Sequence, residues 1–269
     1  MNIREIDWNR VCLELKRDKS FNGGDSAYWD KRAHSFARNT SGSDYAGRFL
    51  RFIRVRPNWT VLDMGCAAGT LAIPLAERVK EVTAVDISDR MLTMLREQCS
   101  KLGIMNIRSL RGSWEDDWET VGIGEYDVAI ASRSLITDDY RSAISKLDRA
   151  ARKRVCISTF VGDGPHDRHI YEAMGRELNT GPDYIYFCNL LYQMGINANL
   201  NFIHSNVRNS YESHEEAFGI IGLRLGKMSQ SEEDALSAYL KRHLIRRGGK
   251  WKMPYHRKIN WAVLWWDKG

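Results

Sequence analysis

Hydrophobic residues in this chain form short apolar runs that alternate with stretches of helical periodicity from about residue 60 onward. A short apolar run bounded by turn residues is typical of a strand buried on both faces, and its alternation with helices favours a parallel sheet. We therefore predict an α/β fold with a seven-stranded, mostly parallel, doubly wound sheet and helices on both faces. The expected strands lie at 61–62, 81–86, 106–110, 126–132, 155–160, 201–207 and 259–266.

Helical patterns precede the sheet and interrupt it before its last strand. Ser213 and Ser231 are each followed three residues later by an acidic residue, a pattern that predicts a helix start. Gly248 and Gly249 would then end the second of these helices. We expect an N-terminal helical lid, a sheet core, a helical cap and a last core strand, at residues 1–46, 47–210, 211–250 and 251–269 respectively.

The segment from Thr60 to Ala76 combines a strand, a turn of small residues and a helix. Such a loop aims backbone N–H groups at a ligand, and glycine lets the ligand approach the backbone closely. Asp63 stands just before Gly65, where a carboxylate would repel a pyrophosphate. The same carboxylate favours a ligand that carries an ammonium and a sulfonium group.

The string Asp63-x-Gly65-x-Ala67-x-Gly69 resembles the first motif of class I S-adenosylmethionine (SAM)-dependent methyltransferases, with alanine at a position where glycine is more frequent. Asp86 follows Gly65 by 21 residues, which places its carboxylate at the end of the next strand, within reach of both ribose hydroxyls of an adenosine. The resemblance implies SAM as cofactor. Beyond these residues, the cofactor-binding residues it implies include Cys66, Ile87, Met91 and Ser132.

Aromatic residues are expected to complete the cofactor site. Tyr28 and Trp29 are similar to the N-terminal lid of many methyltransferases of this class, although they could equally form a core stripe. In the family, the loop after the third strand borders the adenine. Ser113 stands there in place of an acid, so we expect a polar contact from Ser113 and ring packing from Trp114.

The end of the fourth strand, Ser132-Arg133, lies where donor and acceptor meet in this family. It lacks the Asn/Asp-Pro-Pro-Tyr sequence of family members that methylate exocyclic amines of bases or a glutamine amide, and the Pro-Cys sequence of cytosine-C5 enzymes, which argues against those substrates. Arg133 is a candidate for steering an anionic acceptor, and His166 is a candidate base. We predict no metal site, because neither His166 with His169 nor Asp138 with Asp139 has an identifiable third ligand.

Composition and charge limit the classes of function and the cellular location that we expect. The 269 residues lack a signal-peptide pattern and an apolar run long enough for a membrane span, which predicts a cytoplasmic protein without membrane contact. The five cysteines form no Cys-x-x-Cys pair, so neither a disulfide framework nor a zinc site is indicated. We expect a methyltransferase acting on a small molecule. Alternatives are an RNA methyltransferase using the basic tract at 241–258 and a non-catalytic SAM-binding regulator.

Overall fold

The computed structural model describes residues 5–17, 25–40, 44–207 and 209–269. Its centre is a seven-stranded sheet in the order β3-β2-β1-β4-β5-β10-β6. The strands from β3 to β5 are parallel, whereas β10 runs antiparallel to both β5 and β6, which confirms the predicted fold class. The strands are β1 (Thr60–Met64), β2 (Glu81–Asp86), β3 (Ile107–Arg111), β4 (Tyr126–Ser132), β5 (Ala151–Val161), β6 (Asn199–Val207) and β10 (Arg257–Asp267).

The sheet is covered on both faces, as alternate residues of β1 illustrate. Leu62 and Met64 belong to one apolar cluster, and Val61 belongs to another, because successive side chains of a strand point to opposite faces. The first cluster packs under α1 (Trp8–Arg17), α6 (Trp118–Val121), α7 (Tyr140–Ala150) and α9 (Tyr184–Gln193). The second packs under α3 (Tyr45–Ile53), α4 (Ala72–Ala76) and α5 (Asp89–Leu102).

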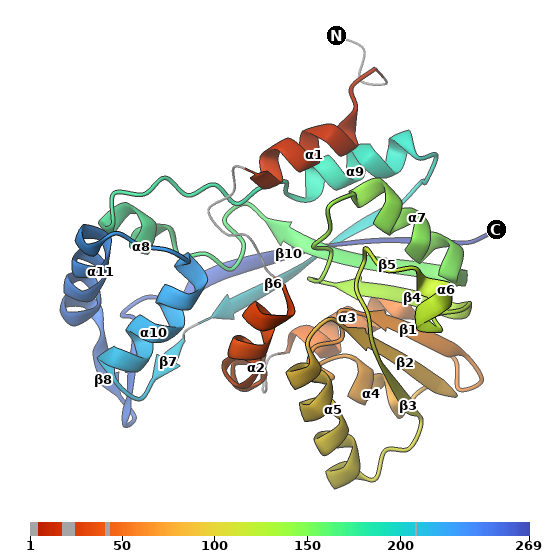
Figure 1. The fold of residues 1–269 in the computed structure, drawn as a ribbon, viewed down its shortest axis with the longest axis horizontal. Coiled ribbons are helices and arrows are strands. Elements are labelled where there is room, and N and C mark those ends of the chain that lie inside the picture. The colour runs from red at the N-terminus through yellow and green to blue at the C-terminus, as the bar shows by residue number, and fades with distance from the viewer. Residues whose placement is uncertain (1–4, 18–24, 41–43, 208) are drawn as a thin grey trace.

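The two N-terminal helices occupy different places (Figure 1). Helix α1 packs beside α9, where Cys12 is fully buried and the rings of Trp8 and Tyr186 are 6.3 Å apart. Helix α2 (Ser26–Thr40) lies instead between α5 and the α10 region, and its Ala33 packs against Ala68 of the glycine loop. Of these two helices, α2 is therefore the one that covers the glycine loop.

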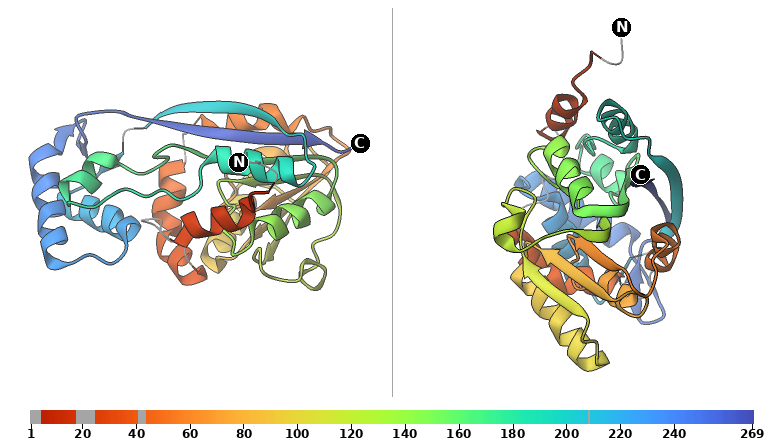
Figure 2. Two further views of the ribbon diagram at one scale, coloured as in Figure 1. Left: turned by 90° about the horizontal axis from the view of Figure 1, so that it is seen from above. Right: turned by 90° about the vertical axis from the view of Figure 1, so that its right-hand side faces the viewer.

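The remaining helices form a separate apolar cluster at one end of the molecule (Figures 1 and 2). We call this part the cap; it consists of α8 (Arg168–Ala173), α10 (His214–Leu225), α11 (Gln230–His243) and a small sheet in the order β7 (Ser210–Tyr211), β9 (Lys250–Lys252), β8 (Ile245–Arg247). Strand β10 extends from the core towards the cap (Figure 2). The cap thus draws α8 from the segment between β5 and β6, in addition to residues 210–252.

The small sheet differs from the helical reading of this segment. Helix α11 ends at His243, and Gly248 and Gly249 form the turn between β8 and β9 instead of ending a helix. Both glycines have positive φ, 58° and 77°, which is the requirement of a tight hairpin turn. Helix α11 also begins earlier than expected, because Ser229 rather than Ser231 forms its capping box. The predicted cap at Ser213 is present, with its hydroxyl accepting from the Glu216 N–H at 3.1 Å.

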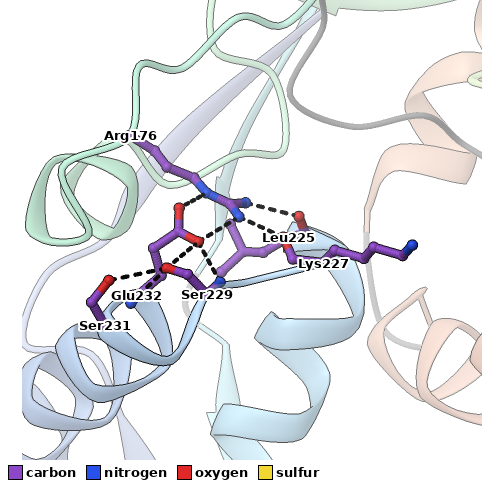
Figure 3. Close-up of polar contacts among 6 residues, drawn as sticks. All are labelled: Arg176, Leu225, Lys227, Ser229, Ser231 and Glu232. Atoms are coloured by element: carbon purple, nitrogen blue, oxygen red, sulfur yellow. Dashed lines mark hydrogen bonds and ion pairs between the residues drawn. The ribbon is translucent and has the colours of Figure 1, made fainter.

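A partly buried arginine joins the parts of the cap. Arg176 follows α8 and forms an ion pair with Glu232 at the start of α11 (Figure 3). Its guanidinium also donates to the backbone carbonyls of Leu225, at 3.0 Å, and Lys227 in the turn between α10 and α11. Arg176 therefore fixes the α10–α11 turn against the segment after α8.

Candidate functional site

A cavity of about 680 Å³ opens above the carboxyl ends of the parallel strands. In open α/β sheets this edge is where ligands bind, at the point where the strand order reverses, here between β1 and β4. Volumes of about 300 to 1,000 Å³ are typical of small-molecule sites. Each parallel strand or the loop after it contributes to the wall, through Gly65, Asp86, Ser113, Ser132 and Thr159.

The glycine loop after β1 turns sharply at the base of this cavity. Gly65 and Ala67 have φ of 78° and 49°, so two residues of the loop adopt left-handed conformations. The backbone N–H groups of Gly65 and Cys66 both donate to the Val85 carbonyl, at 2.8 and 2.9 Å. The loop is therefore tied to the end of β2, and its backbone at Gly65 and Ala67 faces the cavity.

Asp86 holds the loop from the end of β2. Its Oδ2 accepts a hydrogen bond from the Ala67 N–H at 2.8 Å, and its Oδ1 accepts from the Ser88 N–H at 2.9 Å. Burial raises the pKa of Asp86, and these two N–H donors oppose the rise. Each oxygen retains a further lone pair, so the carboxylate can accept hydrogen bonds from a ligand in the cavity.

Asp63 lies below the loop rather than on the cavity wall. It is 2% exposed, and its Oδ2 has no hydrogen-bond partner among the described residues. Burial, with the Asp86 carboxylate as the second cause, raises the pKa of Asp63 to about 7. An unpartnered buried carboxylate beside a second one favours a positive charge in the cavity above them.

Several predicted cofactor residues have other contacts. The Cys66 side chain points into the apolar core, where burial raises the pKa of its thiol. Gly69, with φ of 90°, leaves room for Leu95, so it serves helix packing. Tyr28 stacks edge-on against Trp29 and lies next to Arg32. Four predicted cofactor residues do not line the cavity: Tyr28, Asp63, Cys66 and Gly69. The other predicted residues do line it: Trp29, Gly65, Ala67, Asp86, Ile87, Met91, Ser113, Trp114 and Ser132.

Trp114 belongs to the apolar core and also lines the cavity. It is 6% exposed, its Nε1 donates to the Ser134 carbonyl at 2.8 Å, and its ring packs on Trp118. The Ser113 N–H donates to Asp116 at 2.8 Å. Because these contacts hold the loop after β3 in one conformation, Trp114 presents a preformed apolar surface to the cavity.

At the end of β4, Arg133 adopts a left-handed conformation with φ of 59°. Its guanidinium lies 4.1 Å from the ring centre of Tyr45 and 5.2 Å from that of Trp261. Burial lowers the pKa of Arg133, and its buried Nε has no hydrogen-bond partner in the described structure. Arg133 therefore reaches the cavity wall as a cation held on aromatic faces.

Three hydroxyl groups meet beside Arg133. Tyr45 Oη lies 2.8 Å from Ser132 Oγ and 2.6 Å from Ser158 Oγ, and all three residues line the cavity. The sequence reading did not single out Tyr45 or Ser158. A signal was available for Ser158, because it lies in the strand after Ser132 and pairs with it in the sheet, whereas Tyr45 is separated from both along the chain.

The histidine and aspartate candidates lie in different parts of the structure. His166 is 7% exposed, lines the cavity and has its Nδ1 3.0 Å from the Tyr171 hydroxyl, while His169 lies on the cap surface. Asp138 forms an ion pair with Lys16 at 2.7 Å. Asp139 is the N-cap of α7. No group of three metal-ligating side chains occurs in the described ranges.

The basic tract divides into two parts. Arg246, Arg247 and Lys250 are exposed on the β8–β9 hairpin, and Lys250 pairs with Glu212. Arg257 instead turns inward and lines the cavity together with Arg224, a residue that the sequence reading did not identify. In the described chain, no helix is long and apolar enough to cross a membrane.

The chain is similar to several known proteins. Residues 61–154 match the family model of a methyltransferase domain. An uncharacterized protein of Haemophilus influenzae is 36% identical over 242 residues, which cover 89% of this chain and 88% of that protein.

Two solved structures share the fold at low identity. The crystal structure of a putative methyltransferase from Bacillus halodurans has a TM-score of 0.57 and 13% identity, covering 83% of this chain and 98% of that chain. Coclaurine N-methyltransferase, solved with N-methylheliamine and S-adenosylhomocysteine (SAH), has a TM-score of 0.52 and 13% identity, covering 97% of this chain and 87% of that one.

Proposed function

The chain belongs to the class I SAM-dependent methyltransferases, and from this premise we propose that it methylates a small molecule bound between the glycine loop and the cap. The observation that carries the proposal is the cavity of about 680 Å³, which begins at the Asp86 carboxylate and continues to Arg224 and Arg257 of the cap end. One continuous cavity would therefore have a donor end and a separate acceptor end.

The residues at the donor end fit SAM. The free lone pairs of Asp86 suit ribose hydroxyls, and the apolar surface of Trp114 suits an adenine ring. The unpartnered Oδ2 of Asp63 lies where a cationic ligand above the loop would be stabilised. Trp29 and Met91 add apolar wall, so the site excludes water on that side.

When bound, SAM supplies a methyl group on a positively charged sulfur, which an acceptor can displace without covalent help from the protein. The chain therefore acts mainly by positioning and by excluding water. The hydroxyls of Tyr45, Ser132 and Ser158 would orient the acceptor at the ends of β4 and β5. His166 is our candidate for removing a proton from a hydroxyl acceptor.

A small acceptor is favoured because the cavity has walls on several sides. Helix α2, the loops after the core strands, α10 and β10 all contribute to it. The exposed cations of Arg246, Arg247 and Lys250 lie on the β8–β9 hairpin instead, so they would not guide a polymer into this space.

The test is calorimetric titration with SAM and SAH, followed by methyl transfer from labelled SAM to two fractions of a cell extract, small molecules and RNA. We expect both ligands to bind and the label to enter the small-molecule fraction. Asp86→Asn should weaken binding by roughly 1.5 to 3 kcal/mol. Asp89→Asn, an exposed acid paired with Arg111, is the matched control.

Three outcomes would contradict the proposal. An absence of SAM binding would remove the donor site. Label entering only the RNA fraction would establish a polymer as acceptor. SAM binding without transfer to either fraction would point to a regulatory protein.

A further inference from the structure

The cap end of the cavity carries a concentration of arginine side chains. Arg224 on α10, Arg257 at the start of β10 and Arg32 on α2 all line it, and we call these three the arginine cluster. They come from three separate segments of the chain, so the tertiary fold brings them together.

Two members of the cluster share one acceptor atom. Arg224 Nη1 donates to the Pro165 carbonyl at 3.0 Å, and Arg257 Nη1 donates to the same carbonyl at 2.8 Å and to that of His166 at 2.9 Å. Two positive charges are thus held side by side by one neutral carbonyl. Hydrogen bonds to a neutral group do not cancel the repulsion between the two guanidinium groups.

The nearby acid balances only part of this charge. Asp167 Oδ2 lies 3.5 Å from Arg257 Nε and also accepts from the Tyr255 hydroxyl at 3.0 Å. No ion pair joins Arg224 to a carboxylate in the part of the chain that the structure describes. Burial, followed by the repulsion of Arg32 and Arg257, lowers the pKa of Arg224 to about 10.

Arg224 is partly buried, and a cation partly removed from water without a carboxylate partner is costly unless a ligand supplies the opposite charge. Arginine forks match carboxylate and phosphate oxygens with two parallel hydrogen bonds. We propose that the methyl acceptor carries an anionic group, a carboxylate or a phosphate, that binds to Arg224 and Arg257 of the arginine cluster. This inference rests on the proposed methyl transfer, because it names the substrate class of that same cavity.

Arg257 of the cluster is separate from the donor end, whereas Arg32 lies beside Trp29. In the sheet, β1, β4 and β5 lie between β2, which ends at Asp86, and β10, which begins at Arg257. At strand spacings of about 4.8 Å, the two strands are roughly 19 Å apart. The anion would therefore hold the far end of the acceptor and leave its reactive atom near the ends of β4 and β5.

The experiment measures binding of two probes, inorganic pyrophosphate and succinate, to the full chain saturated with SAH, at constant ionic strength. Calorimetry and thermal unfolding are compared for the wild type, Arg224→Met and the control Arg246→Met. Arg246 lies exposed on the β8–β9 hairpin, outside the cavity. We expect at least one probe to bind, and its identity distinguishes phosphate from carboxylate recognition.

Arg224→Met should weaken binding of that probe by roughly tenfold or more, whereas Arg246→Met should leave its affinity unchanged. Without a probe, Arg224→Met should unfold at the same or a higher temperature than the wild type, because a repelled, partly buried charge is removed while the Pro165 carbonyl keeps its hydrogen bond from Arg257. If Arg224 had only a structural role, Arg224→Met would lower the unfolding temperature. Arg224→Lys, which keeps the charge but not the fork, should give a smaller loss and serves if the methionine variant does not fold.

Three results would overturn the inference. The first is that neither probe binds the SAH-loaded protein, and the second is that probe binding is the same in the wild type and both Arg224 variants. The third is that Arg224→Met weakens binding of SAH as much as binding of the probe, which would assign the arginine to the donor site. Failure of SAH itself to bind the wild type would refute the proposed function instead, so the two failures are distinguishable.

Discussion

The α-carbon of Gly65 lies directly against the side chain of Ser134, so that a Cβ at position 65 would overlap Ser134 Cβ. Ser134 in turn donates from its Oγ to the Met64 carbonyl at 2.5 Å. The loop after β1 is therefore locked to the loop after β4. Both loops line the cavity, so their contact fixes this part of the cavity wall.

This contact gives Gly65 a structural role in addition to close approach of a ligand. Gly65→Ala should lower the free energy of unfolding by about 2 to 4 kcal/mol, because a left-handed alanine and a steric overlap both add cost. Gly103→Ala, with φ of 68° and open space around it, isolates the backbone cost of about 1 kcal/mol. Urea unfolding measures both, and equal losses would contradict the role of Ser134.

Asp63 should make SAM binding depend on pH. Its pKa of about 7 in the folded protein lies above its usual value, so the carboxylate becomes charged only as pH rises through about 7. SAM carries a sulfonium, so its affinity should increase over that range, and SAH should respond less. Titrations from pH 5.5 to 8.5 would measure this, and Asp63→Asn should flatten the SAM curve. A wild-type affinity for SAM that is constant over the range would contradict this.

The same pKa has a consequence for stability without ligand. A group whose folded pKa is raised stabilises the fold fully below its unfolded pKa, and this contribution is lost as pH rises through the folded value. The free protein should therefore unfold more easily at pH 8 than at pH 5, and Asp63→Asn should reduce that difference in thermal unfolding.

Helix α2 should become more protected when SAM binds. Asp30 of α2 accepts from the Ser88 hydroxyl at 2.6 Å and from the Arg90 N–H at 3.1 Å, which joins this helix to the start of α5. Hydrogen exchange of residues 26–37 should slow with SAM, while β3, which has no residue on the cavity wall, should not change. Equal exchange of α2 with and without SAM would make it static structure.

The Arg176–Glu232 pair should stabilise the cap only above acidic pH. Hydrogen bonds from Arg176 lower the pKa of Glu232 to about 2, below its usual 4.5. The contribution is therefore present above about pH 4.5 and is lost as pH falls towards 2. Glu232→Gln should destabilise the protein at pH 7 more than at pH 3 in chemical unfolding. Glu233→Gln, which removes the next charge in the first turn of α11, is the control.

The sequence alone determined the sheet core and the position of Asp86 at the end of β2, for local reasons. Apolar runs and turn residues specify strands, and the spacing from Gly65 to Asp86 places the carboxylate at the end of the neighbouring strand. The chain conformation over about 25 residues decides these features. They are therefore readable without knowing what the rest of the molecule does.

Only the tertiary structure decided the acceptor end of the cavity. Gly248-Gly249 suits a helix end and a hairpin turn equally well, and the pairing of β9 with β7 selects the hairpin. Arg32, Arg224 and Arg257 have no common motif, and they meet because the cap packs beside α2 and β10. Whether an arginine is exposed, as Arg246 is, or turned into a cavity depends on contacts between distant segments, which local sequence patterns do not encode.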